Sequence, residues 1–86
     1  MIISNSVTVL GTSVFKSTNL STVTLPDSVT TIGVQAFQNC TRLGSVRMSN
    51  SVTFLGQSAF AETNLSRLTL PNSVITIEGG ALPSCL

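Results

Sequence analysis

The 86-residue sequence contains no histidine, tyrosine or tryptophan, and only three of its side chains are carboxylates. A serine or cysteine nucleophile needs a general base beside it, and no residue at a sensible spacing can supply one. The two cysteines, Cys40 and Cys85, lack the partner ligands that a zinc site requires. We therefore expect no enzymatic activity, no metal site and no cofactor.

Charge is also scarce, because only 8% of the residues are charged and the net charge is +1. No basic stripe or polybasic patch is present, so we expect binding neither to nucleic acid nor to anionic lipid. The N-terminal residues 1–6 have neither a positive leader nor a long apolar run, so we expect no signal peptide there. No apolar stretch is long enough to span a bilayer. Polar surface must come from serine and threonine, which make up 25 of the 86 residues.

What the sequence does contain is a repeat of 22 or 23 residues, and repeats of this length are typical of solenoids. Shifting the chain by 45 residues aligns 6–40 with 51–85 and gives identity at 20 of 35 positions, so an alternating pair of coils has been duplicated. The whole chain is predicted to be one solenoid segment with coils at 6–27, 28–50, 51–72 and, in part, 73–86, preceded by the end of another coil at 1–5.

Apolar residues recur in the same column of each coil, where stacked side chains would form the core of a solenoid. The columns are Val7, Val29, Val52 and Val74; Leu10, Ile32, Leu55 and Ile77; Phe15, Phe37, Phe60 and Leu82; Leu20, Leu43 and Leu65; Val23, Val46 and Leu68; and Leu25, Met48 and Leu70. Phe54 is the one aromatic residue outside these columns.

The segments 20–26, 43–49 and 65–71 alternate apolar and polar residues, which predicts strands of a parallel sheet, one from each coil. Residues 28–33 and their equivalents are predicted to form a second, shorter extended segment on another side. The stretch through 36–37 is too short for more than a helical turn.

Gly11, Gly33 and Gly56 close the second extended segment in three successive coils. We expect each of them to adopt a positive φ at the bend, which only glycine does readily.

The motif L-x-x-V-x-L-P, followed by S-V-T-x-I-G-x-x-A-F-x-x-C, resembles the BspA-like leucine-rich repeat from Met1 to Cys85. The resemblance implies a β-rich leucine-rich-repeat solenoid of about three and a half coils. It also implies bacterial or protist surface proteins that adhere to host proteins or cells. Thr18 and Thr63 replace the cysteine of the motif, and the fourth coil is degenerate because its glycine and phenylalanine are replaced by Glu78 and Leu82.

Solenoids usually bind through an extended sheet face. The predicted binding residues are the outward positions of the main sheet: Thr22, Thr24, Ser45, Arg47, Arg67 and Thr69. Arg47 and Arg67 would lie on adjacent strands, offset by one pleat, where both could hold one acidic group. The partner would be another protein or a cell-surface macromolecule. The alternative is a solvated polar face on a structural spacer without its own ligand. Phe54 could belong to a second contact surface.

Cys40 and Cys85 share a column two coils apart, which places their Cα atoms ~10 Å apart, beyond the ~7 Å reach of a disulfide. We therefore expect them to be buried residues that line the core. Asn19, Asn39 and Asn64 each begin a glycosylation sequon, and they are either turn residues or acceptors.

Neither end of the repeat carries a polar cap, which a solenoid needs to shield its core. We expect the chain to be part of a longer array. The alternative is end-to-end self-association, in which copies stack on their open faces. The resemblance implies a location at the cell surface or outside the cell.

Overall fold

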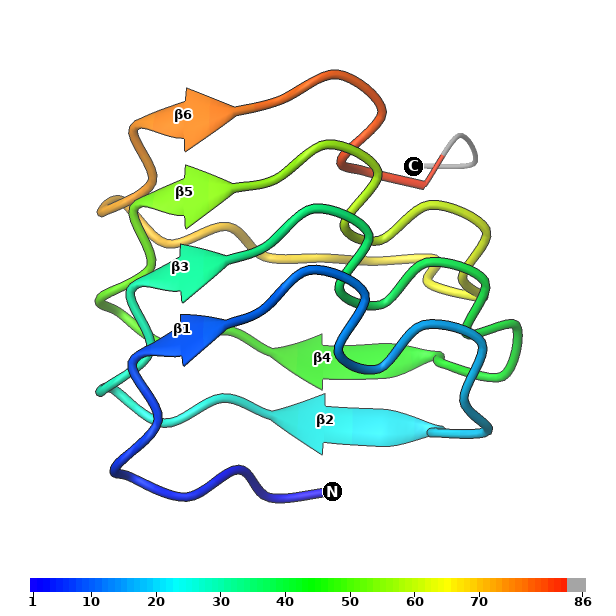
Figure 1. Cartoon of the computed structure of the whole chain (residues 1–86), viewed down its shortest axis with the longest axis horizontal. Helices are drawn as coiled ribbons and strands as arrows, with labels where there is room; N and C mark the ends of the chain where they lie inside the picture. Colours follow the sequence, from blue (N-terminus) through cyan, green and yellow to red (C-terminus); the bar gives the residue numbers. More distant parts are fainter. Residues whose placement is uncertain (84–86) are drawn as a thin grey trace.

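The computed structural model describes residues 1–83, which wind into a stack of coils (Figure 1). Each coil places one short strand on the same side of the stack. These strands form a parallel sheet in the order β1 (Val9–Leu10), β3 (Thr31–Ile32), β5 (Phe54–Leu55) and β6 (Thr76–Ile77). Val9 pairs with Thr31, and Thr31 pairs with Phe54, so the register follows the sequence repeat. The predicted β-rich parallel solenoid is confirmed.

A second parallel sheet on another side pairs β2 (Thr22–Thr24) with β4 (Ser45–Arg47). Ile2 extends it by a single bridge to Thr24. The strand predicted at 65–71 was wrong, because no strand forms there in the third coil. An extended chain can point alternate side chains inward without pairing, so the alternating pattern alone does not ensure a strand. The side predicted to carry the main sheet therefore has fewer strands than the other.

The third side of each coil is built from turns, and residues 1–83 contain no helix, which agrees with the expectation that the stretch through 36–37 is too short for more than a helical turn. Alternate main-chain N–H groups on this side donate to the next coil. Those of Phe15, Phe37 and Phe60 do so at 2.9, 2.8 and 2.8 Å. The intervening N–H groups bond to the carbonyl three residues back, as Val14 does to Gly11 at 3.2 Å.

This alternation requires left-handed backbone at two columns of the turn side, where φ lies between 57 and 70°. One column holds three polar residues and a glycine, and the other holds three polar residues. In order they are Ser13, Gln35, Ser58 and Gly80, and then Ser17, Asn39 and Glu62. Left-handed backbone costs a residue other than glycine about 1–2 kcal/mol. The bonds to the next coil must offset that cost.

Positive φ was predicted at three glycines, Gly11, Gly33 and Gly56, and none of them has it. Two of them serve a different purpose. A Cβ atom on Gly33 would lie 2.5 Å from the main-chain oxygen of Leu10, and one on Gly56 would lie 2.5 Å from the main-chain nitrogen of Val34. Successive coils approach too closely at this corner for any side chain. At Gly11, nothing lies within 4 Å.

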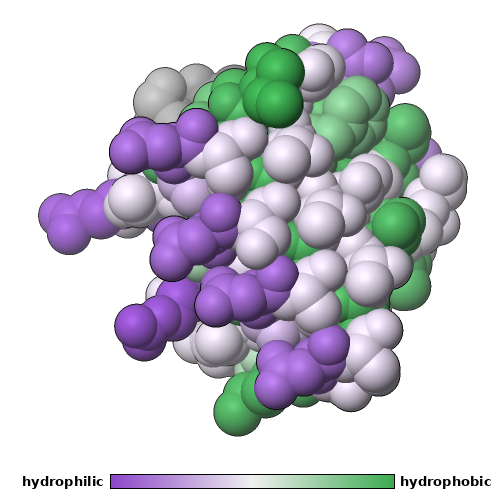
Figure 2. Space-filling model, turned by 90° about the vertical axis from the view of Figure 1, so that its left-hand side faces the viewer, coloured by the Kyte–Doolittle hydropathy of each residue, from purple (hydrophilic) through white to green (hydrophobic). Residues whose placement is uncertain are grey.

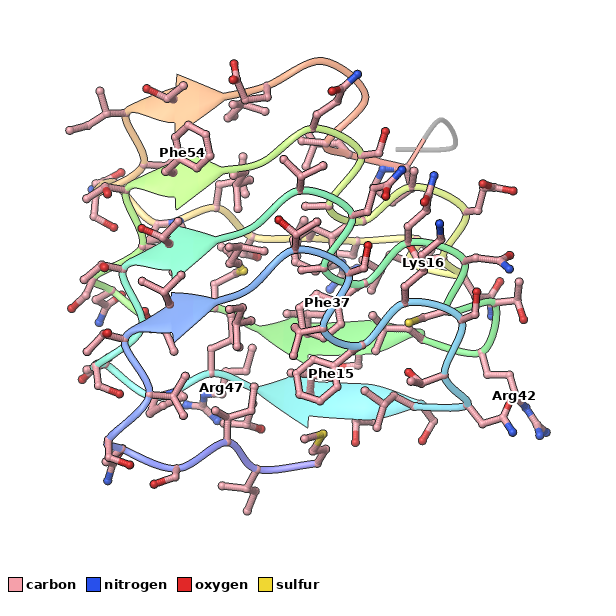
Figure 3. The ribbon with its side chains drawn as sticks, viewed as in Figure 1. Phe15, Lys16, Phe37, Arg42, Arg47 and Phe54 are labelled. Carbon is pink, nitrogen blue, oxygen red and sulfur yellow. The ribbon has the colours of Figure 1, made fainter. Side chains whose placement is uncertain are left out.

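The apolar columns pack into one core between the three sides. Phe15, Phe37 and Phe60 stack with ring centroids 5.4 and 5.2 Å apart and nearly parallel planes. The stack of Phe15 under Phe37 is visible in Figure 3. Burial is greatest in the second and third coils. The fourth coil, predicted to be degenerate, keeps its place in the sheet, since the N–H of Glu78 still donates to the carbonyl of Leu55 at 3.0 Å.

Serine hydroxyls join the coils at the corner between the two sheets. Ser28 and Ser73 occupy equivalent positions and donate to carbonyls of the preceding coil at 2.6 and 2.7 Å. In the coil between them, the equivalent Ser51 makes no such side-chain bond. Ser49, at a position that is proline in the neighbouring coils, donates to the carbonyl of Val29 at 3.0 Å instead. The second coil, in which serine replaces the corner proline of both neighbouring coils, thus has a buried hydroxyl in its place.

Candidate recognition face

The six side chains predicted to point outward from the second sheet are all exposed. Pairing of β2 with β4 sets Thr22 beside Ser45 and Thr24 beside Arg47. Between them, Val23 points inward and is buried. We call the six residues the outward face; they are Thr22, Thr24, Ser45, Arg47, Arg67 and Thr69.

A groove of about 440 Å³ runs between β4 and the third coil. It brings together three predicted residues, Ser45, Arg47 and Thr69, while the other three lie outside its lining. Four further residues complete the lining, and the sequence reasoning missed them: Val46, Met48, Asn50 and Pro71. No sequence signal indicates this groove, because it depends on the third coil failing to pair with β4.

The burial of the inward side chains confirms that the core is open at this groove. In the first coil, Val23 and Leu25 are only 2% and 4% exposed. Their equivalents in the second coil, Val46 and Met48, are only partly buried although that coil has neighbours on both sides. The groove therefore has an apolar floor below a polar rim.

The outward face carries positive charge that no neighbour neutralises. Arg47 and Arg67 are exposed, and within residues 1–83 no side-chain ion pair forms. Of the three carboxylates, that of Asp27 accepts from the N–H of Asn50 at 3.4 Å at one end of the groove, while Glu62 lies on the turn side and Glu78 follows β6. The prediction that the two arginines lie on adjacent strands was wrong, since Arg67 is not on a strand. That both arginines bind the same acidic group stays a prediction.

Polar and apolar surfaces are separated around the corner between the sheets. In Figure 2, most of the hydrophilic side chains lie at the left and most of the hydrophobic ones at the top and right, with side chains of intermediate hydropathy covering much of the face between them. The exposed apolar residues of the four-stranded side include Val9 (55%) and Ile75 (83%). Phe54 lies on β5 and is half-buried, so it is less exposed than we expected. A second contact surface there stays a prediction.

Cys40 is a free, fully buried thiol, as expected of a residue that lines the core. Its Sγ donates to the carbonyl of Phe15 at 3.0 Å and lies 3.3 Å from the hydroxyl of Thr18. Cys85 lies outside the described residues. Within residues 1–83, no group of three or more His, Cys, Asp or Glu side chains is placed to hold a metal ion.

The three sequon asparagines, Asn19, Asn39 and Asn64, are all exposed. The amide nitrogen of Asn39 donates to the hydroxyl of Ser17 at 3.2 Å, and its backbone is left-handed, with φ of 61°. Asn39 therefore acts as a turn residue. Whether the asparagines are acceptors stays a prediction. Over the part of the chain that the structure describes, no helix has the length and apolar character needed to cross a membrane.

Comparisons with known proteins agree with this architecture. The solved structure of a leucine-rich repeat protein from Bacteroides capillosus ATCC 29799 is similar, with a TM-score of 0.86 and 36% identity over 93% of this chain and 59% of that one. A leucine rich cell surface protein from Faecalibacterium prausnitzii A2-165 gives a TM-score of 0.89 and 33% identity over 99% of this chain and 23% of that one.

This chain thus spans less than two thirds of either solved protein. No curated protein matches. The family model described as the BspA type leucine rich repeat region (6 copies) matches residues 1–86. With the whole chain matched and its coils stacked as the repeat requires, the chain belongs to the BspA-type leucine-rich repeat family.

Proposed function

We propose that the outward face is a recognition surface for another protein or a cell-surface macromolecule. The observation that carries the proposal is Arg47, an exposed arginine without a carboxylate partner, beside a groove with the apolar floor of Val46 and Met48. Arginine is enriched where proteins bind proteins, and an apolar centre with a polar rim is the usual anatomy of such an interface. The site is built for binding rather than for catalysis.

We also propose that this recognition takes place at the cell surface and serves adhesion. One support is the similar solved protein from Faecalibacterium prausnitzii, which is described as a cell surface protein. The other is the surface chemistry of this chain, in which serine and threonine supply most of the polarity and charge is rare. The partner would then be a protein of the host cell or of its matrix.

The test is the double variant Arg47→Ala with Arg67→Ala, measured for binding to epithelial cells and to immobilised matrix proteins. Arg42→Ala is the matched control, because Arg42 lies on the loop before β4, at the opposite end of that strand from Arg47 (Figure 3). We expect the double variant to lose binding at an unchanged urea midpoint, and the control to keep it.

The alternative is a structural spacer with no ligand of its own. The regular ladder of main-chain bonds between coils favours it, because such a ladder gives a rigid stack whatever the outward residues are. Equal binding by the wild type, the double variant and the control would support the spacer and overturn the recognition proposal.

A further inference from the structure

We propose that Asn72 is a site of spontaneous modification, at which the main-chain nitrogen of Ser73 attacks the asparagine side chain and ammonia is released. The reaction needs no partner, so it is independent of the recognition face. Attack is easiest where a small residue follows the asparagine, and three pairs in the chain meet that condition: Asn5-Ser6, Asn50-Ser51 and Asn72-Ser73. All three asparagines are exposed, but the structure leaves only the third pair unprotected.

The reaction is a ring closure followed by hydrolysis, with water as the only co-reactant. The nitrogen of Ser73 loses its proton and bonds to the side-chain carbonyl carbon of Asn72, while the bond from that carbon to the amide nitrogen breaks and ammonia leaves. The product is a five-membered cyclic imide. Water then opens the ring: attack at the former side-chain carbon gives aspartate, and attack at the main-chain carbon gives isoaspartate. Because the attacking nitrogen must lose its proton, the rate should rise with pH.

In the first two pairs the attacking N–H group is already engaged. The N–H of Ser6 donates to the hydroxyl of Ser4 at 3.3 Å, and the N–H of Ser51 donates to the hydroxyl of Ser49 at 3.2 Å. In both cases the acceptor belongs to the residue just before the asparagine. Such a hydrogen bond stabilises the protonated nitrogen and has to break before the nitrogen can attack, so these two asparagines are protected.

The third pair lacks this protecting hydroxyl, because the residue before Asn72 is Pro71. Within residues 1–83, the N–H of Ser73 donates no hydrogen bond, and the side chain of Asn72 forms none. The hydroxyl of Ser73 does donate to the carbonyl of Val52, at 2.7 Å. That bond anchors the serine side chain but leaves its main-chain nitrogen free. Nucleophile and target are therefore both unengaged at this corner.

Ring closure also requires the main chain to rotate at Asn72, so that the nitrogen swings toward the side chain. One bond across the turn opposes this rotation, from the N–H of Val74 to the carbonyl of Pro71 at 3.3 Å. Val74 is only partly buried and Ile75 is 83% exposed, whereas Val52, which follows the corner one coil earlier, is fully buried. Opening the corner at Asn72 therefore disrupts less packing than opening the earlier one.

The fold accommodates the aspartate product, because Asp27 already occupies the equivalent exposed position in the first coil, between a proline and a serine. The serine that follows makes the same hydroxyl bond to the preceding coil in both places, at 2.6 and 2.7 Å. Isoaspartate instead lengthens the main chain by one methylene group at the corner. Either product adds one negative charge beside the groove wall at Pro71, which takes the net charge from +1 to zero.

The test is incubation of the full chain in mildly alkaline buffer, followed by digestion with trypsin and mass spectrometry. Trypsin cleaves after lysine and arginine, so the three pairs fall in separate peptides, 1–16, 48–67 and 68–86. We expect Asn72 to convert about tenfold faster than Asn5 or Asn50, the factor that corresponds to one hydrogen bond. In urea, where the protecting bonds are lost, the three rates should be similar. Equal rates in the folded chain, or the same preference in urea, would overturn the proposal.

Variants of the preceding residue test the protecting hydroxyl itself. Pro71→Ser supplies the hydroxyl that Ser49 supplies one coil earlier, and it should slow conversion of Asn72 about tenfold. Pro71→Ala is the matched control, since it removes the proline ring without adding a hydroxyl, and it should leave the rate unchanged. Ser49→Ala should speed conversion of Asn50 by a similar factor. The urea midpoint of each variant shows that it is folded. Equal slowing by Pro71→Ala and Pro71→Ser would overturn the proposal.

Discussion

At the scale of single residues, the glycines show how a repeat position can be conserved through the coils for a reason that the sequence does not reveal. A glycine before a turn suggests positive φ, and the chain adopts none at Gly33 or Gly56. The constraint comes from the neighbouring coil, whose main chain occupies the space that a Cβ atom would need. Such a contact joins residues more than twenty positions apart, so local pattern could not predict it.

We expect Gly33→Ala to lower the free energy of unfolding by about 1–3 kcal/mol, the usual cost of forcing atoms into a packed site. The clash is with the main-chain oxygen of Leu10, which cannot move away as a flexible side chain can. Gly11→Ala is the matched control. It should change stability little, or raise it by up to about 1 kcal/mol, because nothing lies within 4 Å of the added atom and alanine restricts the unfolded chain.

Urea unfolding followed by circular dichroism measures both variants, and the difference in midpoint gives the change in stability. An equal effect of the two substitutions would contradict the role of close approach. It would instead favour a conformational role shared by both glycines.

At the scale of the elements, sequence reasoning succeeded where a pattern repeats and failed where pairing depends on neighbours. The columns that contain Phe37, Ile32 and Leu43 were predicted from spacing alone, and these residues are fully buried. The left-handed turn side was missed because polar residues such as Gln35 and Glu62 give no sign of it. The groove beside β4 was missed because segment 65–71 has the same alternation of apolar and polar residues as the segments that form β2 and β4.

Each phenylalanine of the column should stabilise the stack of coils in proportion to the number of rings on which it stacks. Phe37 stacks on two rings and Phe15 on one. Leucine already occupies this column at Leu82, where it packs against the core. Substitution by leucine should therefore remove the ring contacts without a large cavity. Each stacked pair contributes about 0.5–1.5 kcal/mol, so Phe37→Leu should cost about twice as much as Phe15→Leu.

Chemical denaturation of the two variants and of the wild type checks this ratio. The exposure of the sites reinforces the expected order, since Phe37 is fully buried and Phe15 is not. A larger loss of stability for Phe15→Leu than for Phe37→Leu would mean that the rings stabilise the stack by contacts at its end rather than by stacking on one another.

At the scale of the whole molecule, the coils contact only their neighbours, so stability should rise with the number of interfaces between coils. The alternation of 22- and 23-residue coils defines which insertion keeps the register. A second copy of residues 28–72, placed after Asn72, adds one coil of each kind and rebuilds the same corner at its junctions. Each new coil would then make the same main-chain hydrogen bonds to its neighbours as the existing coils make. Its apolar side chains would pack against the neighbouring coils in the same columns.

We expect this lengthened chain to unfold at a higher urea concentration and with a larger m-value, because more surface is buried per molecule. The control carries the same insertion without its first serine, so that one residue is missing at the junction. That deletion shifts the following alternation by one position and turns inward side chains outward. The control should gain no stability over the original chain. If both insertions raised the midpoint equally, the added coils would be stabilised by unspecific burial, and the register set by the repeat would not govern how this solenoid stacks.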